Sequence, residues 1–568
     1  MNIWNKCNLY VFSFFVVSQL FVSVLHAQVT VGSLTTPMEG ALLDIKTVDA
    51  SDVENTAQGV LMPRVELVDR GELLPMLENN VTYTTGTAAQ KKQLKADHKG
   101  LAVYNLTKNA AFSEGIYIWD GQRWVANTVN KVVQGDAQSN SFMVPPATGV
   151  YIPLKKAFDV WSSYKVPKGN SLTILGNEYL DGLNTLIAMN GGWGNVKAYL
   201  LWQDKPGLVC NASPDPETLN ELPLIGADEN ANILVLSNGS VGGNAVIAFA
   251  SKNGTNPPVV LWSWHVWFTD YNPNLDASGN PQIIDTYGKR TALNGNVHRH
   301  NNETGLGGDY VFMDRNLGAR TNLPVDDNTE LLYQWGRKDP FPGMRDRQNP
   351  TIAHPIYDAA NELVEYDVEN DPVPTNPGIA KMKTNLIPSE DNRKNNLANS
   401  IMSPKVFFTT ASTTVTDWYT TETNSSYQNN YLWGTADEKS PFDPCPKGWR
   451  VPYQTNTYSP WYFGISDGTN VGSQYGVTWN KGVHFTGNSA YDMGYYPNTG
   501  FRDNAGNFYD IWDNGYVWSA TSDVSLGTDA GKSYNFQYGH DGNPSDITIK
   551  TSSQFGRIYG FAVRCVAE

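Results

Sequence analysis

The chain has little positive charge, few cysteines and no long helical periodicity. Its 41 lysine and arginine residues are outnumbered by 56 aspartate and glutamate residues, and the net charge of −15 argues against binding to nucleic acid or anionic lipid. It also lacks a nucleophile elbow, a P-loop and a dinucleotide-binding glycine motif. Glycine (50), tyrosine (29) and tryptophan (17) are abundant. This composition predicts a β-rich protein, and its length predicts about two to four domains.

The long apolar run of the chain lies at its N-terminus, between Leu9 and Leu25, and follows a single positive charge. Ala27 supplies a small residue for cleavage, so we predict a signal peptide at residues 1–27 and export to the outer cell surface or beyond. A membrane anchor is the alternative, but spanning usually takes about 20 apolar residues. Cys7 precedes the run and is therefore not a lipoprotein acceptor. No later run of that length predicts a transmembrane segment in the mature chain.

Three cysteines would remain after cleavage. Cys445 and Cys565 lie in similar phrases, each with an arginine and a bulky apolar residue nearby, and in an exported protein a disulfide between them is the economical prediction. Such a bridge closes a loop of about 120 residues, for which the chain-entropy model gives roughly 4–5 kcal/mol of stabilisation. Cys210 follows an apolar stretch and is predicted to be a buried thiol, with intermolecular pairing as the alternative.

Residues 28–128 predict an N-terminal β module, because short strands end in an Asp-Gly turn at Asp120. Its phrases occur in the order Leu43-Asp-Ile45, Leu61-Met-Pro-Arg64 and Trp119-Asp-Gly-Gln-Arg-Trp124. This order resembles a module common in exported Bacteroidetes proteins and in some phage-fibre-like proteins. A module of this size buries little core alone, which leaves self-association open.

Residues 130–275 predict a β-sandwich of the immunoglobulin-like type, with about six strands separated by Asn/Gly turns. The strand from Val259 to Phe268 carries aromatic residues on both faces, which predicts a central, covered strand. The phrases Gly243-Asn-Ala-Val-Ile-Ala248 and Leu261-Trp-Ser-Trp-His-Val-Trp267 resemble a sandwich domain found before the C-terminal module of Bacteroides surface proteins.

Residues 305–568 predict a third domain with an Asn/Pro-rich insertion at about 343–430 that has little core of its own. Three phrases resemble the Fibrobacter succinogenes major paralogous domain family: Cys445-Pro-Lys-Gly-Trp-Arg-Val-Pro452, Trp518-Ser-Ala-Thr521 and Gly560-Phe-Ala-Val-Arg-Cys565. The resemblance implies an α+β fold of the C-type-lectin-like and formylglycine-generating class, with its ends together. The whole chain would then be multidomain and β-rich. Enzymatic relatives need active-site cysteines as well, and here both cysteines are committed to the bridge.

Aromatic residues gather in three loop-like segments of this domain. Flat rings beside Asn and Asp suit stacking on sugars or anchoring a protein partner. The alternative is that these rings form the half-buried scaffold that a loop-rich fold needs. The predicted ligand-contact residues are Tyr458, Trp461, Tyr462, Tyr495, Tyr496 and Trp512.

A weak calcium candidate consists of Asp503, Asn507 and Asp510, whose hard oxygen donors lie on one short loop. The alternative is an Asx/Gly hairpin turn. His298 and His300 lack an acidic or cysteine partner at ligand spacing, so we predict no metal there. We predict no other cofactor.

Other candidate catalytic residues have structural interpretations. The neighbouring pair Asp326-Asp327 cannot provide the opposed carboxylates of a glycosidase. Trp449, Arg450 and Arg564 are predicted to be structural anchors, with the guanidinium groups held by carboxylates or carbonyls.

These patterns predict a secreted or surface-displayed, non-enzymatic binding protein of a Bacteroidetes-type bacterium, adhesin-like, with a glycan or protein ligand. The alternative is a structural subunit or tip component of a surface filament or layer that self-associates through its N-terminal module. A polysaccharide-processing enzyme is a third, weaker hypothesis, because the sequence contains no recognisable set of catalytic residues for it.

Overall fold

The computed structural model comprises two compact units, Met1–Pro63 and Arg64–Glu568. The structure describes residues 29–31, 43–45, 61–107, 112, 114–126, 132–163, 183–237, 242–252, 258–274, 297–300, 310–322, 331–343, 353–364, 393–409, 416–420, 428–454, 461, 478–479, 481–486, 492–523, 531–540 and 547–568. In the first unit, β1 (Val29–Val31) and β2 (Leu43–Ile45) pair in parallel. The predicted signal peptide lies outside the described residues.

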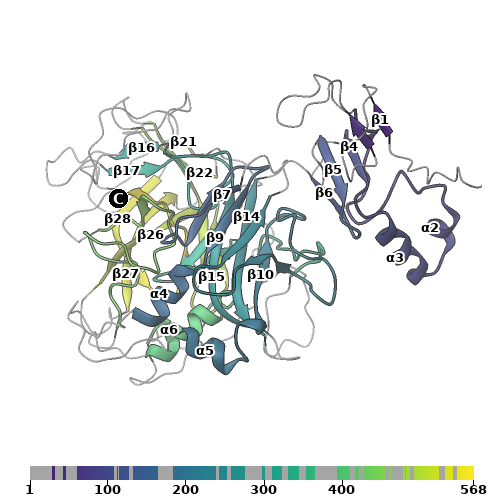
Figure 1. Ribbon diagram of the computed structural model, residues 1–568. Coiled ribbons are helices and arrows are strands. Elements are labelled where there is room, and N and C mark those ends of the chain that lie inside the picture. The colour runs from purple at the N-terminus through teal and green to yellow at the C-terminus, as the bar shows by residue number, and fades with distance from the viewer. Residues whose placement is uncertain are drawn as a thin grey trace, which may run out of the picture. The chain divides into compact units, whose positions relative to one another are not determined.

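The second unit begins with a small sheet in the order β3-β4-β5-β6 (Figure 1). The predicted hairpin is present: Trp119 pairs with Trp124, and Asp120 Oδ1 accepts hydrogen bonds from the amides of Gln122 and Arg123, each at 2.8 Å. Helix α3 begins at a capping box made by Thr87. The elements are β3 (Arg64–Val65), α2 (Val81–Thr85), α3 (Ala88–Asp97), β4 (Ala102–Asn105), β5 (Gly115–Trp119) and β6 (Trp124–Ala126).

The middle of the chain forms two sheets, a five-stranded one in the order β11-β10-β14-β15-β8 and a four-stranded one in the order β12-β13-β9-β7. Strand β15 lies between β14 and β8 and is buried on both faces from Leu261 onward, which confirms the prediction for that segment. The strands are β7 (Val132–Gln134), β8 (Ser141–Val144), β9 (Gly149–Pro153), β10 (Val196–Gln203), β11 (Glu221–Leu222), β12 (Leu224–Ile225), β13 (Asn232–Leu236), β14 (Gly243–Ser251) and β15 (Val259–Phe268), with helices α4 (Lys155–Ser163), α5 (Leu183–Met189) and η1 (Trp193–Asn195).

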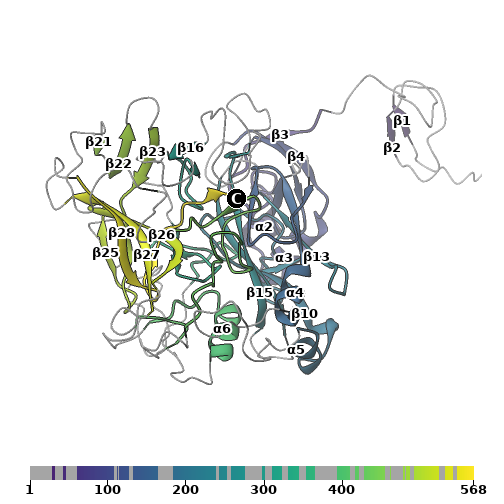
Figure 2. The same cartoon turned by 90° about the vertical axis from the view of Figure 1, so that its left-hand side faces the viewer.

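The C-terminal part contains four small sheets. In the described residues their orders are β16-β17-β30-β20, β19-β18-β29-β24-β25, β21-β22-β23 and β26-β27-β28. Figure 2 labels the strands of the last two of these sheets. The elements are β16 (Val297–His300), β17 (Tyr310–Met313), β18 (Leu331–Gln334), β19 (Phe341–Pro342), α6 (Arg393–Met402), β20 (Trp449–Arg450), β21 (Thr478–Trp479), β22 (Gly482–Thr486), β23 (Asp492–Pro497), β24 (Thr499–Arg502), β25 (Phe508–Ile511), β26 (Asn514–Ser522), β27 (Lys532–His540), β28 (Ile547–Gly556), β29 (Gly560–Phe561) and β30 (Val566–Ala567).

The last strand of the C-terminal part lies beside two earlier strands of that part. Strand β30 is antiparallel to both β17 and β20, with Val566 opposite Phe312 and opposite Arg450. The chain therefore returns at its end to the sheet in which this part begins. Together the sheets make a multidomain, β-rich protein, which agrees with the predicted fold class.

The described parts of the segment at about 343–430, predicted as an insertion with little core of its own, pack into a core shared with other parts of the chain. Its described parts supply buried side chains to the same core cluster as the sandwich tryptophans, and Tyr357 exchanges backbone hydrogen bonds with Gln203 of β10 at 2.7 and 2.9 Å. The packing partners of these apolar side chains lie elsewhere in the chain. The inserted core residues include Ile356, Leu397, Ile401, Phe408, Trp418 and Tyr419.

Candidate functional site

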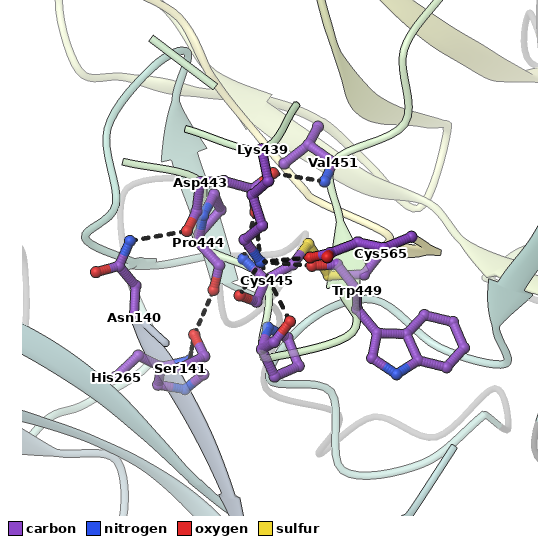
Figure 3. The surroundings of a disulfide bond; sticks show 12 residues. Asn140, Ser141, His265, Lys439, Asp443, Pro444, Cys445, Trp449, Val451 and Cys565 are labelled. Atoms are coloured by element: carbon purple, nitrogen blue, oxygen red, sulfur yellow. Dashed lines mark hydrogen bonds and ion pairs between the residues drawn. A yellow bond between two sulfur atoms is a disulfide. The ribbon is translucent and has the colours of Figure 1, made fainter. Parts of the chain in front are cut away.

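The disulfide joins Cys445 to Cys565, as predicted, across a sequence separation of 120 residues (Figure 3). Both cysteines are fully buried. The ammonium group of Lys439 donates hydrogen bonds to the carbonyl oxygens of Cys445, at 2.6 Å, and of Trp449, and it lies 3.4 Å from Asp443 Oδ1. The bridge therefore sits in a polar network that fixes the backbone on one side of it.

Asp443 organises this network from a fully buried position. Its Oδ1 accepts from the Cys445 amide at 2.8 Å, and its Oδ2 accepts from the Val451 amide at 2.9 Å. From strand β8 and the residue before it, Asn140 Nδ2 donates to the Asp443 carbonyl at 2.8 Å and Ser141 Oγ donates to the Pro444 carbonyl at 2.6 Å (Figure 3). The cysteine-bearing segment is thus bound to strand β8 of the five-stranded sheet as well as to the C-terminal strand.

Arg564 and Arg450 occupy buried anchoring positions, in line with their predicted structural role. Arg564 donates to Asn316 Oδ1 at 3.1 Å and to the Tyr495 carbonyl at 2.7 Å, while Arg450 donates to the carbonyl of Ala436 at 2.9 Å. Cys210 is a buried free thiol, as predicted.

His265, on strand β15, connects the five-stranded sheet to this network. Its Nδ1 lies 3.1 Å from Ser141 Oγ (Figure 3). Its Nε2 lies 2.9 Å from Asn244 Oδ1. The side chain is buried, and burial lowers its pKa to about 3. The imidazole is therefore neutral in the folded protein at neutral pH.

We expect this histidine to make the protein less stable in acid. Between pH 6.5, the ordinary histidine pKa, and pH 3 the unfolded chain binds a proton that the folded chain does not, so stability falls as pH falls. At pH 5 the loss from His265 is about 2 kcal/mol relative to pH 7. Urea unfolding of the parent protein and of His265→Gln at both pH values measures it. Equal losses in the two proteins would assign the acid sensitivity to other groups.

The predicted ligand-contact residues Trp461, Tyr495 and Tyr496 are a correction, because the structure places all three rings inside the protein. Trp461 is 0% exposed, with its ring stacked on Phe536 at 5.2 Å between centroids. Tyr496 is also 0% exposed, and the Arg564 guanidinium lies 3.6 Å from its ring centroid. The rings of Trp461 and Tyr496 belong to the buried cluster in which β22 contacts β27, and Tyr495 is 6% exposed, so none of the three presents a flat face to a ligand.

The other three predicted contact residues have different outcomes. Trp512 is half-buried, packs against that same cluster and has the Lys481 ammonium 4.4 Å from its ring centroid. Tyr458 and Tyr462 lie outside the described residues, so their assignment stays a prediction.

The calcium candidate is an Asx turn, the alternative that the sequence offered. Asp503 Oδ1 accepts hydrogen bonds from the amides of Ala505, at 2.9 Å, and Asn507, at 2.8 Å, between β24 and β25. Asp510 Oδ2 accepts from the Tyr516 hydroxyl at 2.7 Å. The described residues contain no group of three or more His, Cys, Asp or Glu that could hold a metal ion. The side chains of His298 and His300, and the pair Asp326-Asp327, lie outside the described residues.

A feature that the sequence interpretation missed is exposed apolar surface near the N-terminus. The described residues include eight exposed large apolar side chains, and half of them fall between positions 61 and 106: Leu61 (80%), Val68 (67%), Val81 (74%) and Leu106 (41%). Val68 and Leu106 belong to neighbouring segments, because Leu106 N donates to the Val65 carbonyl and Thr107 Oγ1 donates to the Leu67 carbonyl. In the sequence, the sign of this exposed surface was an apolar residue directly after a strand: Leu106 follows β4.

Comparison with known proteins adds one finding for this region. Residues 30–140 match the family model of a phage tail-like trimerisation region. No curated protein and no solved structure matches the chain. The matched segment covers most of the predicted N-terminal module at residues 28–128, extends beyond it to residue 140, and contains all four of the exposed apolar residues at positions 61–106. Within the described part of the chain, no helix is both long and apolar enough to cross a membrane.

Proposed function

We propose that this protein is an exported, non-enzymatic structural subunit of a surface filament or layer, and that it assembles as a trimer through residues 30–140. The observation that carries the proposal is the match of those residues to a phage tail-like trimerisation region. Export rests on the signal-peptide pattern at residues 1–27.

The packing of the matched region supports self-association. In the described part of the chain, its own core cluster consists of Leu67, Leu73, Leu77, Tyr83, Val103, Phe112, Tyr117, Trp119 and Trp124. A core of this size stabilises an isolated module weakly. Exposed apolar side chains rimmed by polar residues are typical of association surfaces, and contact with further copies would bury Val68 and Leu106.

The same region also has a built connection to the rest of the chain. The buried guanidinium of Arg123 donates to the carbonyl oxygens of Cys210 and Ala212, and Gln122 Nε2 donates to Asp215 Oδ2 at 2.8 Å. Assembly at the N-terminal module would therefore position the sandwich and the C-terminal part of each subunit through these contacts.

Light scattering after size exclusion tests the proposal. The chain from residue 28 onward is expected to elute with three times its own mass, and deletion of residues 28–128 is expected to leave a monomer, because it removes most of the matched region. The double variant Val68→Glu/Leu106→Glu is expected to shift the trimer toward monomer, because it places charges in the association surface.

Ile225→Glu is the matched control, since Ile225 is 52% exposed but lies outside the matched region. A parent chain that stays monomeric at high micromolar concentration would contradict the proposal. If the parent is a trimer and the double variant remains one, the trimer is supported but its interface lies away from Val68 and Leu106.

The adhesin-like hypothesis stays a prediction. Three of its six proposed contact residues are fully or nearly fully buried and therefore do not support it: Trp461, Tyr495 and Tyr496. The structural hypothesis is favoured because residues 30–140 match a phage tail-like trimerisation region.

A further inference from the structure

Helix α3 and the residues directly after it are basic, although the chain as a whole is acidic. Residues 88–99 contain four lysines and one aspartate, a net charge of +3 with histidine counted as neutral, whereas the whole chain carries −15. None of the side chains of α3 is buried. Lys95 forms an ion pair with Glu72 at 2.9 Å, and Lys91 Nζ donates to the Thr84 carbonyl of α2 at 3.2 Å. These two lysines therefore have partners within the module.

Two other lysines of this stretch face solvent without such partners. Lys92 and Lys99 are both exposed, and their spacing of seven residues places them on the same side of the helix. Among the described residues, neither ammonium group has a hydrogen-bond or ion-pair partner. Helix α2 lies beside α3 (Figure 1), and its first residue, Val81, is 74% exposed, the largest value for a large apolar side chain in the second unit. We call Val81, Lys92 and Lys99 the basic surface.

The turn between β12 and β13 carries the opposite charge. Asp228 and Glu229 are exposed in this turn. Ile225, at the end of β12, is 52% exposed, the largest value for a large apolar side chain described outside the matched region. Lys155 of α4 is near Glu229 but forms its ion pair with Asp159, at 2.9 Å. We call Ile225, Asp228 and Glu229 the acidic surface.

The two surfaces are complementary in charge and alike in apolar character. Each combines one strongly exposed aliphatic side chain with two exposed charges of one sign, and the signs are opposite. A contact between them would cover Val81 and Ile225 and would pair the lysines with the carboxylates, which is the arrangement that favours specific association. Because the basic surface belongs to a chain of net charge −15, a second copy of the chain is itself an acidic partner.

We propose that the basic surface of one copy binds the acidic surface of a copy in another trimer, and that this contact joins trimers into the filament or layer. The inference rests on the proposed trimer. Two different surfaces meet in this contact, so it does not end with a closed pair and can continue from trimer to trimer. A single exposed ion pair is weak, but a trimer presents three copies of each surface, and several contacts made together strengthen one another.

Sedimentation velocity of the chain from residue 28 onward tests this contact. At about 0.01 M sodium chloride, where the Debye length is about 30 Å, the parent should form species larger than the trimer, and at about 1 M, where it is about 3 Å, the trimer alone. The variants Lys92→Glu/Lys99→Glu and Asp228→Lys/Glu229→Lys should each remain trimers at low salt, because like charges then face one another. An equimolar mixture of these two variants should form large species again, because each variant supplies the charges that the other has lost.

Lys252→Glu/Lys550→Glu is the matched control, because it changes the net charge equally at two lysines outside both surfaces and should assemble as the parent does. Circular dichroism melts establish that each variant is folded. A parent that is a trimer at both salt concentrations would overturn this inference and leave the trimer in place, whereas a monomer at high salt would overturn the trimer itself. Large species formed by either charge-reversal variant alone, or a mixture that stays trimeric, would also overturn the inference.

Discussion

The double variant Cys445→Ser/Cys565→Ser is expected to lose about 4–5 kcal/mol of unfolding free energy, because the bridge closes a loop of 120 residues. The bridge removes conformational freedom from the unfolded chain, and that freedom returns when both cysteines are replaced. Urea unfolding of the oxidised parent and of the double variant, followed by tryptophan fluorescence, measures the difference.

Cys210→Ala is the control for this experiment, because Cys210 is a buried free thiol that takes no part in the bridge. It should cost far less than the double variant. A loss below about 1 kcal/mol in the double variant would mean that the network of Lys439 and Asp443 alone holds the two segments together.

The second large effect is expected at Arg557, whose replacement by methionine should cost about 3–5 kcal/mol. Its Nη1 lies 3.1 Å from Asp417 Oδ2, its Nη2 donates to Ser522 Oγ at 2.8 Å, and its guanidinium lies 4.6 Å from the Trp335 ring centroid. The side chains of Arg557 and Asp417 are 0% and 2% exposed. Removal of the cation leaves a buried carboxylate without its charge partner, which is the source of the cost.

The double variant Arg557→Met/Asp417→Leu separates charge from packing. It removes both members of the pair, so it should recover most of the lost stability, since a buried ion pair can often be replaced by apolar residues with little change. Thermal unfolding of the parent, the single variant and the double variant provides the comparison. A double variant as unstable as Arg557→Met would show that lost packing and hydrogen bonds, and not the stranded carboxylate, cause the effect.

Features with a local signature could be predicted from the sequence. The turn at Asp120 combines an Asp-Gly pair with flanking aromatic residues, and strand β15 has aromatic residues on both faces. The Cys445–Cys565 bridge could be predicted because the sequence has a signal-peptide pattern and its two cysteines in matching phrases offer few pairings. In each case the decisive residues are close in the sequence or few in number.

Burial that depends on distant partners could not be predicted in the same way. Trp461 lies in a polar, loop-like stretch, yet its ring stacks on Phe536 of β27. Tyr199 of β10 and Ser403 likewise line one groove, although they are neighbours only in the folded chain. An aromatic residue in an irregular segment has the same local sequence whether it covers a core or faces a ligand.

The central claim is that three copies of this chain assemble through residues 30–140. Copies of the chain with and without a C-terminal affinity tag are expressed together in the same cells. Native mass spectrometry of the resulting complexes tests the claim most directly. A trimer predicts four mass species, containing zero, one, two or three tagged chains. Two species, each with the mass of a single chain, would contradict the claim, and three species would replace the trimer by a dimer.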